Sequence, residues 1–113
     1  MKIHIGSKIF DAELEDNATA TAFKALLPLS AKMLELNGNE KYSKLPEKLP
    51  TNASHPGTIH AGDLMLYGSD TLVLFYKTFS TSYSYTRVGR INDPAALAAA
   101  MGSANVKASF HGE

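Results

Sequence analysis

The sequence predicts a mostly β protein, a small antiparallel barrel or sandwich whose ends are covered by two short helices. Three observations lead to this expectation. Six or seven short segments are rich in β-forming residues or alternate between apolar and polar side chains. Turn signals separate them at intervals of about 8–12 residues, which is typical of all-β barrels and sandwiches. Only two segments have both the apolar spacing and the caps of a helix.

Length and composition indicate one folded domain spanning residues 1–113, since single domains of about 100–150 residues are the commonest. Eleven basic residues balance eleven acidic ones, so no strong field is available to attract nucleic acid or an anionic membrane. The absence of cysteine excludes disulfides, thiol nucleophiles and cysteine-based zinc sites. No apolar run approaches the ~20 residues of a membrane span, and no secretory signal is recognised. We therefore expect a soluble, cytoplasmic protein.

The chain begins with the pattern of a β-hairpin. Residues 2–5 and 8–16 flank Gly6 and Ser7, and a glycine at the first central position suits a type II′ turn. In the second arm apolar and polar side chains alternate, which indicates one buried and one exposed face.

A helix is expected next, over residues 18–27. Asp16 and Asn17 supply an N-cap, and Pro28 should end the helix. Its apolar stripe has helical spacing and consists of Thr19, Phe23, Leu26 and Leu27.

Residues 29–36, LSAKMLEL, suit either a strand or a helix, and they end at Asn37-Gly38, a strong hairpin-turn signal. Residues 43–57 hold three of the five prolines and little periodicity. We expect this segment to be an irregular surface loop, and loops of such length are often functional.

Residues 62–68 and 71–77 are two short apolar runs around a polar turn, the pattern of a buried hairpin. If residues 79–87, FSTSYSYTR, continue as a strand, alternate side chains point to opposite sides. One side would then carry Phe79, Thr81, Tyr83, Tyr85 and Arg87, and the other would carry Ser80, Ser82, Ser84 and Thr86.

The end of the chain predicts a second helix and a closing strand. Asp93 should cap the helix with Pro94 at its first position, and Gly102 should end it. Its apolar face would consist of Leu97, Ala100 and Met101. Residues 105–110 alternate as a strand does.

These segments together resemble the small bacterial cyclophilin-like domain proteins. The resemblance rests on GDLMLYGSDTLVLFYK at 62–77 and on TRVGRINDPAALAAAMG at 86–102, with LNGNEKY at 36–42 and PGTIHAGDLMLYG at 56–68 fitting one subgroup. It covers essentially the whole chain. The resemblance implies a cyclophilin-like closed antiparallel β-barrel of about eight strands, with the two short helices capping its openings.

The resemblance assigns no catalytic residue. True cyclophilins are peptidyl-prolyl isomerases that use an arginine beside a groove of Phe, Met, Gln, Trp and His. This chain has no tryptophan and lacks the Phe-x-Arg … Gln-Gly-Gly signature, and its only arginines are Arg87 and Arg90. Arg90, in VGRI, is similar to the structural arginine of the cyclophilin FGRV strand.

Few other constellations point to chemistry. His60 and Asp63 are three apart, but Gly62 disfavours a helix, so Asp63 is better interpreted as closing a turn than as an acid–base or metal residue. Neither a nucleophile elbow nor a phosphate-binding loop occurs. We therefore expect no metal and no cofactor. We also expect no nucleic-acid partner, because the net charge is neutral and the aromatic stripe has a single arginine beside it.

The remaining hypothesis is an aromatic groove. Its candidate residues are Tyr83, Tyr85, Arg87, His60 and Tyr42. Large rings beside small hydroxyl residues could line a cleft for a peptide or small ligand, or the rings could simply pack the barrel. The function expected first is a non-catalytic binding module. The alternatives are a weak or divergent prolyl isomerase, with Arg87 or His60 as its donor, and an interaction with another protein through residues 43–57.

Overall fold

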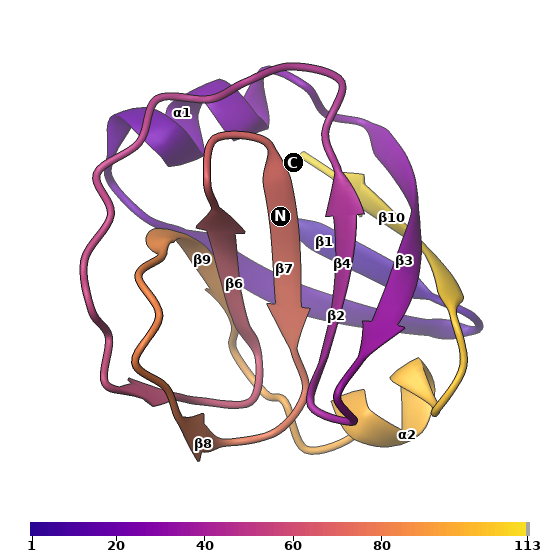
Figure 1. The fold of residues 1–113 in the computed structure, drawn as a ribbon. Coiled ribbons are helices and arrows are strands. Elements are labelled where there is room, and N and C mark those ends of the chain that lie inside the picture. Colours follow the sequence, from indigo (N-terminus) through magenta and orange to yellow (C-terminus); the bar gives the residue numbers. More distant parts are fainter. Residues whose placement is uncertain (113) are drawn as a thin grey trace.

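Eight antiparallel strands close into a barrel in the computed structural model, which describes residues 1–112 (Figure 1). In chain order they are β1 (Lys2–Ile5), β2 (Lys8–Leu14), β3 (Leu29–Leu36), β4 (Glu40–Lys44), β6 (Asp63–Tyr67), β7 (Thr71–Phe75), β9 (Thr86–Ile91) and β10 (Val106–His111). Around the barrel the order is β1-β10-β3-β4-β7-β6-β9-β2, and β2 pairs with β1 to close it. A separate two-stranded sheet consists of β5 (Thr58–Ile59) and β8 (Phe79–Ser80). The predicted fold class is confirmed.

Two tight turns form where the sequence indicates them. Gly6 has a positive φ of 59° and Ser7 has a negative φ. A type II′ turn requires this combination at its two central positions. Asn37 and Gly38 have φ 57° and 69°, the signature of a type I′ turn. The ambiguous segment 29–36 is therefore a strand, β3, which turns directly into β4.

The barrel interior is filled by one apolar cluster to which alternate residues of the strands contribute. The strands β6 and β7 contribute Leu64, Leu66, Leu72 and Leu74, all at most 1% exposed. The two helices close opposite ends of this cluster, as Figure 1 shows: α1 (Ala18–Lys24) and α2 (Leu97–Met101). From α1, Phe23 reaches the core and meets Phe110 edge-on at 5.8 Å between ring centroids.

Both helices are shorter than predicted. Asn17 caps α1 as expected, but the helix ends at Lys24, three residues before Leu27. The prediction that Asp93 caps α2 is wrong. Its carboxylate accepts a hydrogen bond from the Ala95 amide in a preceding turn, and the helix begins only at Leu97. Leu97 and Met101 form the buried face, and Gly102 ends the helix with φ 67°.

Residues 79–87 do not form one continuous strand, which is the condition on which the division of rings from hydroxyls depends. The strand β8 ends at Ser80, and β9 begins at Thr86. Between them the Thr81 hydroxyl accepts a hydrogen bond from the Tyr83 amide, and Tyr85 pairs with Ser54 through two hydrogen bonds of 3.0 Å. Serine and threonine side chains that bond the local backbone compete with a strand ladder. The predicted separation of rings from hydroxyls therefore fails.

Segment 43–57 is irregular after Lys44, where β4 ends. It is anchored by the buried side chains of Leu45 and Leu49, whose amides donate to the carbonyls of Asp70 and Ser69 at 2.7 and 2.8 Å. In residues 1–112 no helix has the length and apolar character needed to cross a membrane.

Candidate functional site

The outer face of the neighbouring strands β4, β7 and β6 carries a second apolar cluster, separate from the barrel core. We call it the outer cluster; its buried members are Ile59, Met65, Val73, Phe75 and Tyr85. The register explains it, because Val73 lies opposite Tyr42 on one side and Met65 on the other, so these side chains form one row across the sheet. The loops that carry β5 and β8 cover part of this face (Figure 1).

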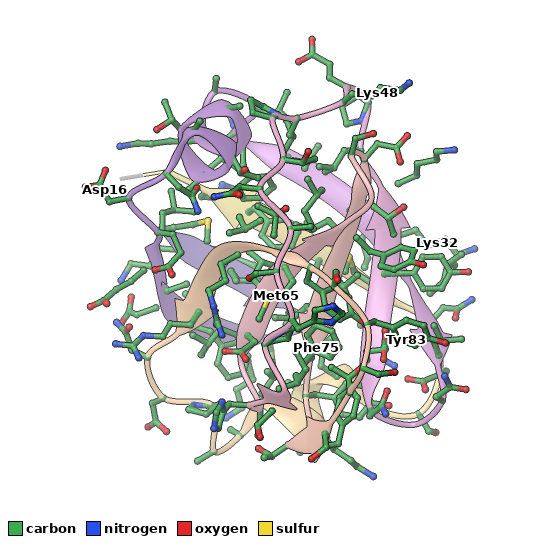
Figure 2. The ribbon with its side chains drawn as sticks, turned by 60° about the vertical axis from the view of Figure 1, so that its left-hand side comes forward. Asp16, Lys32, Lys48, Met65, Phe75 and Tyr83 are labelled. Carbon is green, nitrogen blue, oxygen red and sulfur yellow. The ribbon has the colours of Figure 1, made fainter. Side chains whose placement is uncertain are left out.

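A groove of about 310 Å³ opens at the edge of the outer cluster. We call it the tyrosine groove; it is lined by Leu36, Asn37, Glu40, Tyr42, Tyr67, Thr71, Val73, Tyr83 and Tyr85. In Figure 2, Met65 and Phe75 lie toward the middle of the view and Tyr83 lies to their right. Four tyrosines with an apolar floor give the groove the lining that is typical of ligand sites.

The tyrosine rings meet at angles instead of stacking. Tyr67 lies 6.2 Å from Tyr83 with an interplanar angle of 80°, and 5.7 Å from Tyr85 at 57°. Tyr85 also meets Phe75 of the outer cluster edge-on at 5.4 Å. Tyr85 is thereby held in place at 5% exposure, whereas Tyr83 is 62% exposed. Neither ring points into the barrel core.

Glu40 places a carboxyl group in the wall of the tyrosine groove at only 8% exposure. Burial, together with the nearby charge of Glu35, raises the pKa of the Glu40 carboxyl above its ordinary value. Burial also raises the pKa of Tyr85 to about 12, with further contributions from Glu40 and Tyr67. The groove is therefore both aromatic and acidic.

The other two candidates lie in a different depression, which we call the charged pocket. His60 and Arg87 line it together with Glu13, Glu15, Ala61, Asp63, Gly89, Arg90 and Ile91, around a volume of about 540 Å³. Asp63 accepts a hydrogen bond from the His60 amide at 2.9 Å, whereas the His60 ring nitrogen is 4.0 Å away. The interpretation of Asp63 as a turn-closing residue is confirmed.

The structure thus brings Tyr42, Tyr83 and Tyr85 together and leaves His60 and Arg87 apart from them. Sequence reasoning missed Glu40 and did not select Tyr67 for the groove. The sequence holds one indication that Glu40 belongs to the groove. Glu40 lies two residues before Tyr42, so both side chains are on one face if residues 40–44 form a strand. Within residues 1–112, no group of three His, Asp or Glu side chains gathers as a metal site.

Comparison with protein-family models matches residues 3–111 to the model described as the cyclophilin-like family. The match spans nearly the whole chain, including every strand of the barrel. Searches of curated proteins and of solved structures find no match.

Proposed function

Because the chain belongs to the cyclophilin-like family, we propose that it is a non-catalytic binding module that holds a peptide segment or a small ligand in the tyrosine groove. The observation that supports this proposal is the groove itself, in which four tyrosines surround an apolar floor on the outside of a closed barrel. Tyrosine rings offer a large contact area at a low entropic cost, so they are enriched where proteins bind partners.

A prolyl isomerase is the second function considered, and the placement of the candidate donors does not favour it. Such an enzyme needs an apolar pocket and a hydrogen-bond donor that faces the twisting amide. Arg87 and His60 line the charged pocket, whereas the apolar lining belongs to the tyrosine groove. The candidate hydrogen-bond donors and the apolar surface thus lie in two different depressions, whereas an isomerase needs them in one.

The test is a titration of the protein with mixtures of peptides and metabolites, followed by NMR of the tyrosine rings. We expect the signals of Tyr83 and Tyr85 to shift, and Tyr83→Ala to weaken binding by about tenfold, as for the loss of an aromatic contact residue. Ile9→Ala is the matched control, because Ile9 is 61% exposed and does not line the groove. An absence of tyrosine shifts with every mixture would contradict the proposal.

A protease-coupled assay on an X–Pro peptide separates the two functions. The binding module predicts a rate equal to the uncatalysed control. An accelerated rate that Arg87→Ala abolishes would establish the isomerase instead.

A further inference from the structure

Among residues 1–112, Glu40 is the one acidic side chain that lines the tyrosine groove. The residue is 8% exposed, and within residues 1–112 its carboxylate has no hydrogen bond or ion pair to the protein. Its oxygens are not among the fully buried unpaired atoms of these residues, so they face the solvent of the groove. A partly buried carboxylate loses part of its hydration and gains from a cationic partner. The groove therefore contains an acceptor that is open to a ligand.

The basic residue that follows Glu40 in the chain is not its partner. Lys41 follows Glu40 in β4, so its side chain leaves the opposite face of the strand. Its ammonium is fully engaged: it donates to Glu35 at 2.8 Å and to the carbonyls of Gly102 and Ala104 at 2.9 and 2.6 Å. Among the described residues that line the groove there is no Lys, Arg or His.

The aromatic walls favour the same kind of partner as the carboxylate does. An aromatic ring attracts a cation to its face, and cages of such rings are a recurrent way of binding ammonium groups. Tyr67 stands at 80° to Tyr83 and at 57° to Tyr85, so these rings bound the groove from several directions. A divalent metal ion fits less well, because it requires more oxygen ligands than one carboxylate provides.

We propose that the tyrosine groove recognises an alkylammonium group, with Glu40 as its anionic partner and the tyrosine rings as its walls. The inference rests on the proposed binding function and names the chemistry of the ligand. Two sources carry such a group: the side chain of a lysine in a peptide, and a free amine metabolite. Both present a positive charge at the end of an apolar stem, which matches an acidic wall above an apolar floor.

The experiment compares isosteres that differ only in charge. Choline is titrated against 3,3-dimethyl-1-butanol, and a capped lysine peptide against the same peptide with 2-aminoheptanoic acid in place of lysine, with the tyrosine ring signals as the readout. We expect each cation to bind about tenfold more tightly than its neutral partner, choline through its attraction to the rings and the carboxylate, and the lysine ammonium also through a charge-assisted hydrogen bond. The stronger of the two cations identifies the source of the group.

Variants then test the carboxylate. Glu40→Gln keeps the size of the side chain and should weaken cation binding by about tenfold while leaving the neutral isosteres unchanged. Glu47→Gln is the matched control, because it removes one exposed carboxylate that does not line the groove. The isostere comparison on the unaltered protein needs no variant, so it decides the matter even if Glu40→Gln fails to fold.

The possible failures are distinguishable. Equal binding of charged and neutral isosteres would overturn the ammonium inference and leave the groove as a binding site. Silence of the tyrosine signals toward all four probes would also overturn it, and the mixtures described above would then decide whether the binding function stands.

Discussion

At the scale of a single residue, the carboxyl of Glu40 affects both the stability of the fold and the proposed binding of an alkylammonium group. Burial and the charge of Glu35 raise its pKa in the folded protein. A group whose pKa is raised on folding contributes stability that is fully present below its unfolded pKa, here about 4.5, and is lost as the pH rises through the folded pKa. Glu40 therefore destabilises the unliganded protein at neutral pH, a cost that the proposed binding role would explain.

Glu40→Gln is predicted to stabilise the unliganded protein at pH 7 by about 1 kcal/mol, because a neutral amide is less costly to bury than a carboxylate. Urea unfolding between pH 4 and pH 8 should show the two proteins converging toward pH 4. The pKa of Tyr85 should fall from about 12 in the same variant, since Glu40 contributes to raising it. A stability difference that is independent of pH would contradict this assignment.

The pKa of Glu35 is shifted in the opposite direction from that of Glu40, and Glu35 is present both in the unaltered protein and in Glu40→Gln. Burial by itself would raise its pKa, but hydrogen bonds from Lys41, Tyr76 and the Gly38 amide hold the pKa below its ordinary value of 4.5. Its contribution to stability is thus present above about pH 4.5 and is lost as the pH falls through the folded pKa. Both proteins keep Glu35, so the difference between them reports on Glu40.

At the scale of the element, Asn17 connects α1 to the barrel through both ends of one amide. Its Oδ1 accepts from the Ala20 amide at 2.7 Å and caps the helix, and its Nδ2 donates to the Arg87 carbonyl of β9 at 2.9 Å. The sequence predicts the cap from local pattern alone. The second bond spans 70 residues, so local pattern could not predict it.

Asn17→Ala should lower the free energy of unfolding by about 1–2 kcal/mol, since it removes the cap and the bond to β9. Asn17→Ser retains a capping oxygen but not the amide donor, so it should cost less. Urea denaturation of the three proteins measures both values. Equal losses in the two variants would mean that the cap contributes nothing.

Element boundaries were less predictable than element types. The sequence indicates α2, but its start shifts to Leu97 because Asp93 and Pro94 are used in a separate turn. The strand β4 was missed since its residues are polar, and one of them, Lys41, is buried only because Glu35 and two carbonyls satisfy its ammonium. Neither arrangement is encoded in the spacing of apolar residues.

At the scale of the whole molecule, the two apolar clusters are expected to differ in stability. Seven of the eight barrel strands and both helices contribute side chains to the core cluster, whereas the outer cluster depends in part on short segments around β5 and β8. Elements with few buried contacts open more readily than the core.

Ile59→Ala tests this difference, because Ile59 is fully buried in the outer cluster. We expect hydrogen exchange to accelerate at the amides of Tyr85, Ser54 and Thr81, which bond across the covering loops, while β1 and β10 stay protected. Leu72→Ala, in the core, should cost about 2–5 kcal/mol and accelerate exchange throughout the barrel. Equal acceleration of all amides in Ile59→Ala would show that the clusters open together.

The barrel was predictable as a whole, whereas the tyrosine groove was predictable only in part. Hairpin turns and alternation predict which successive strands pair, and they place Val73 on a strand, whereas Tyr42 lies on the strand that was not predicted. The groove forms between strands and loops that are distant in the chain, and Tyr83 and Tyr85 reach it from an irregular segment. Arg87 would lie on the same face as Tyr83 and Tyr85 only if that segment were a regular strand. The hydrogen bonds of Thr81 and Ser54 to the backbone of this segment prevent a regular strand.

The closure of the barrel restricts how any peptide can be recognised. Each of its eight strands is hydrogen-bonded to two neighbours, although the two pairings of β2 and of β3 involve different parts of the strand. An extended peptide gains affinity in many domains by joining a sheet edge, where its backbone supplies the bonds. Within residues 1–112, no strand of this barrel is a sheet edge along its whole length. In the tyrosine groove a peptide is therefore expected to be identified mainly by an inserted side chain, with less dependence on the residues that flank it.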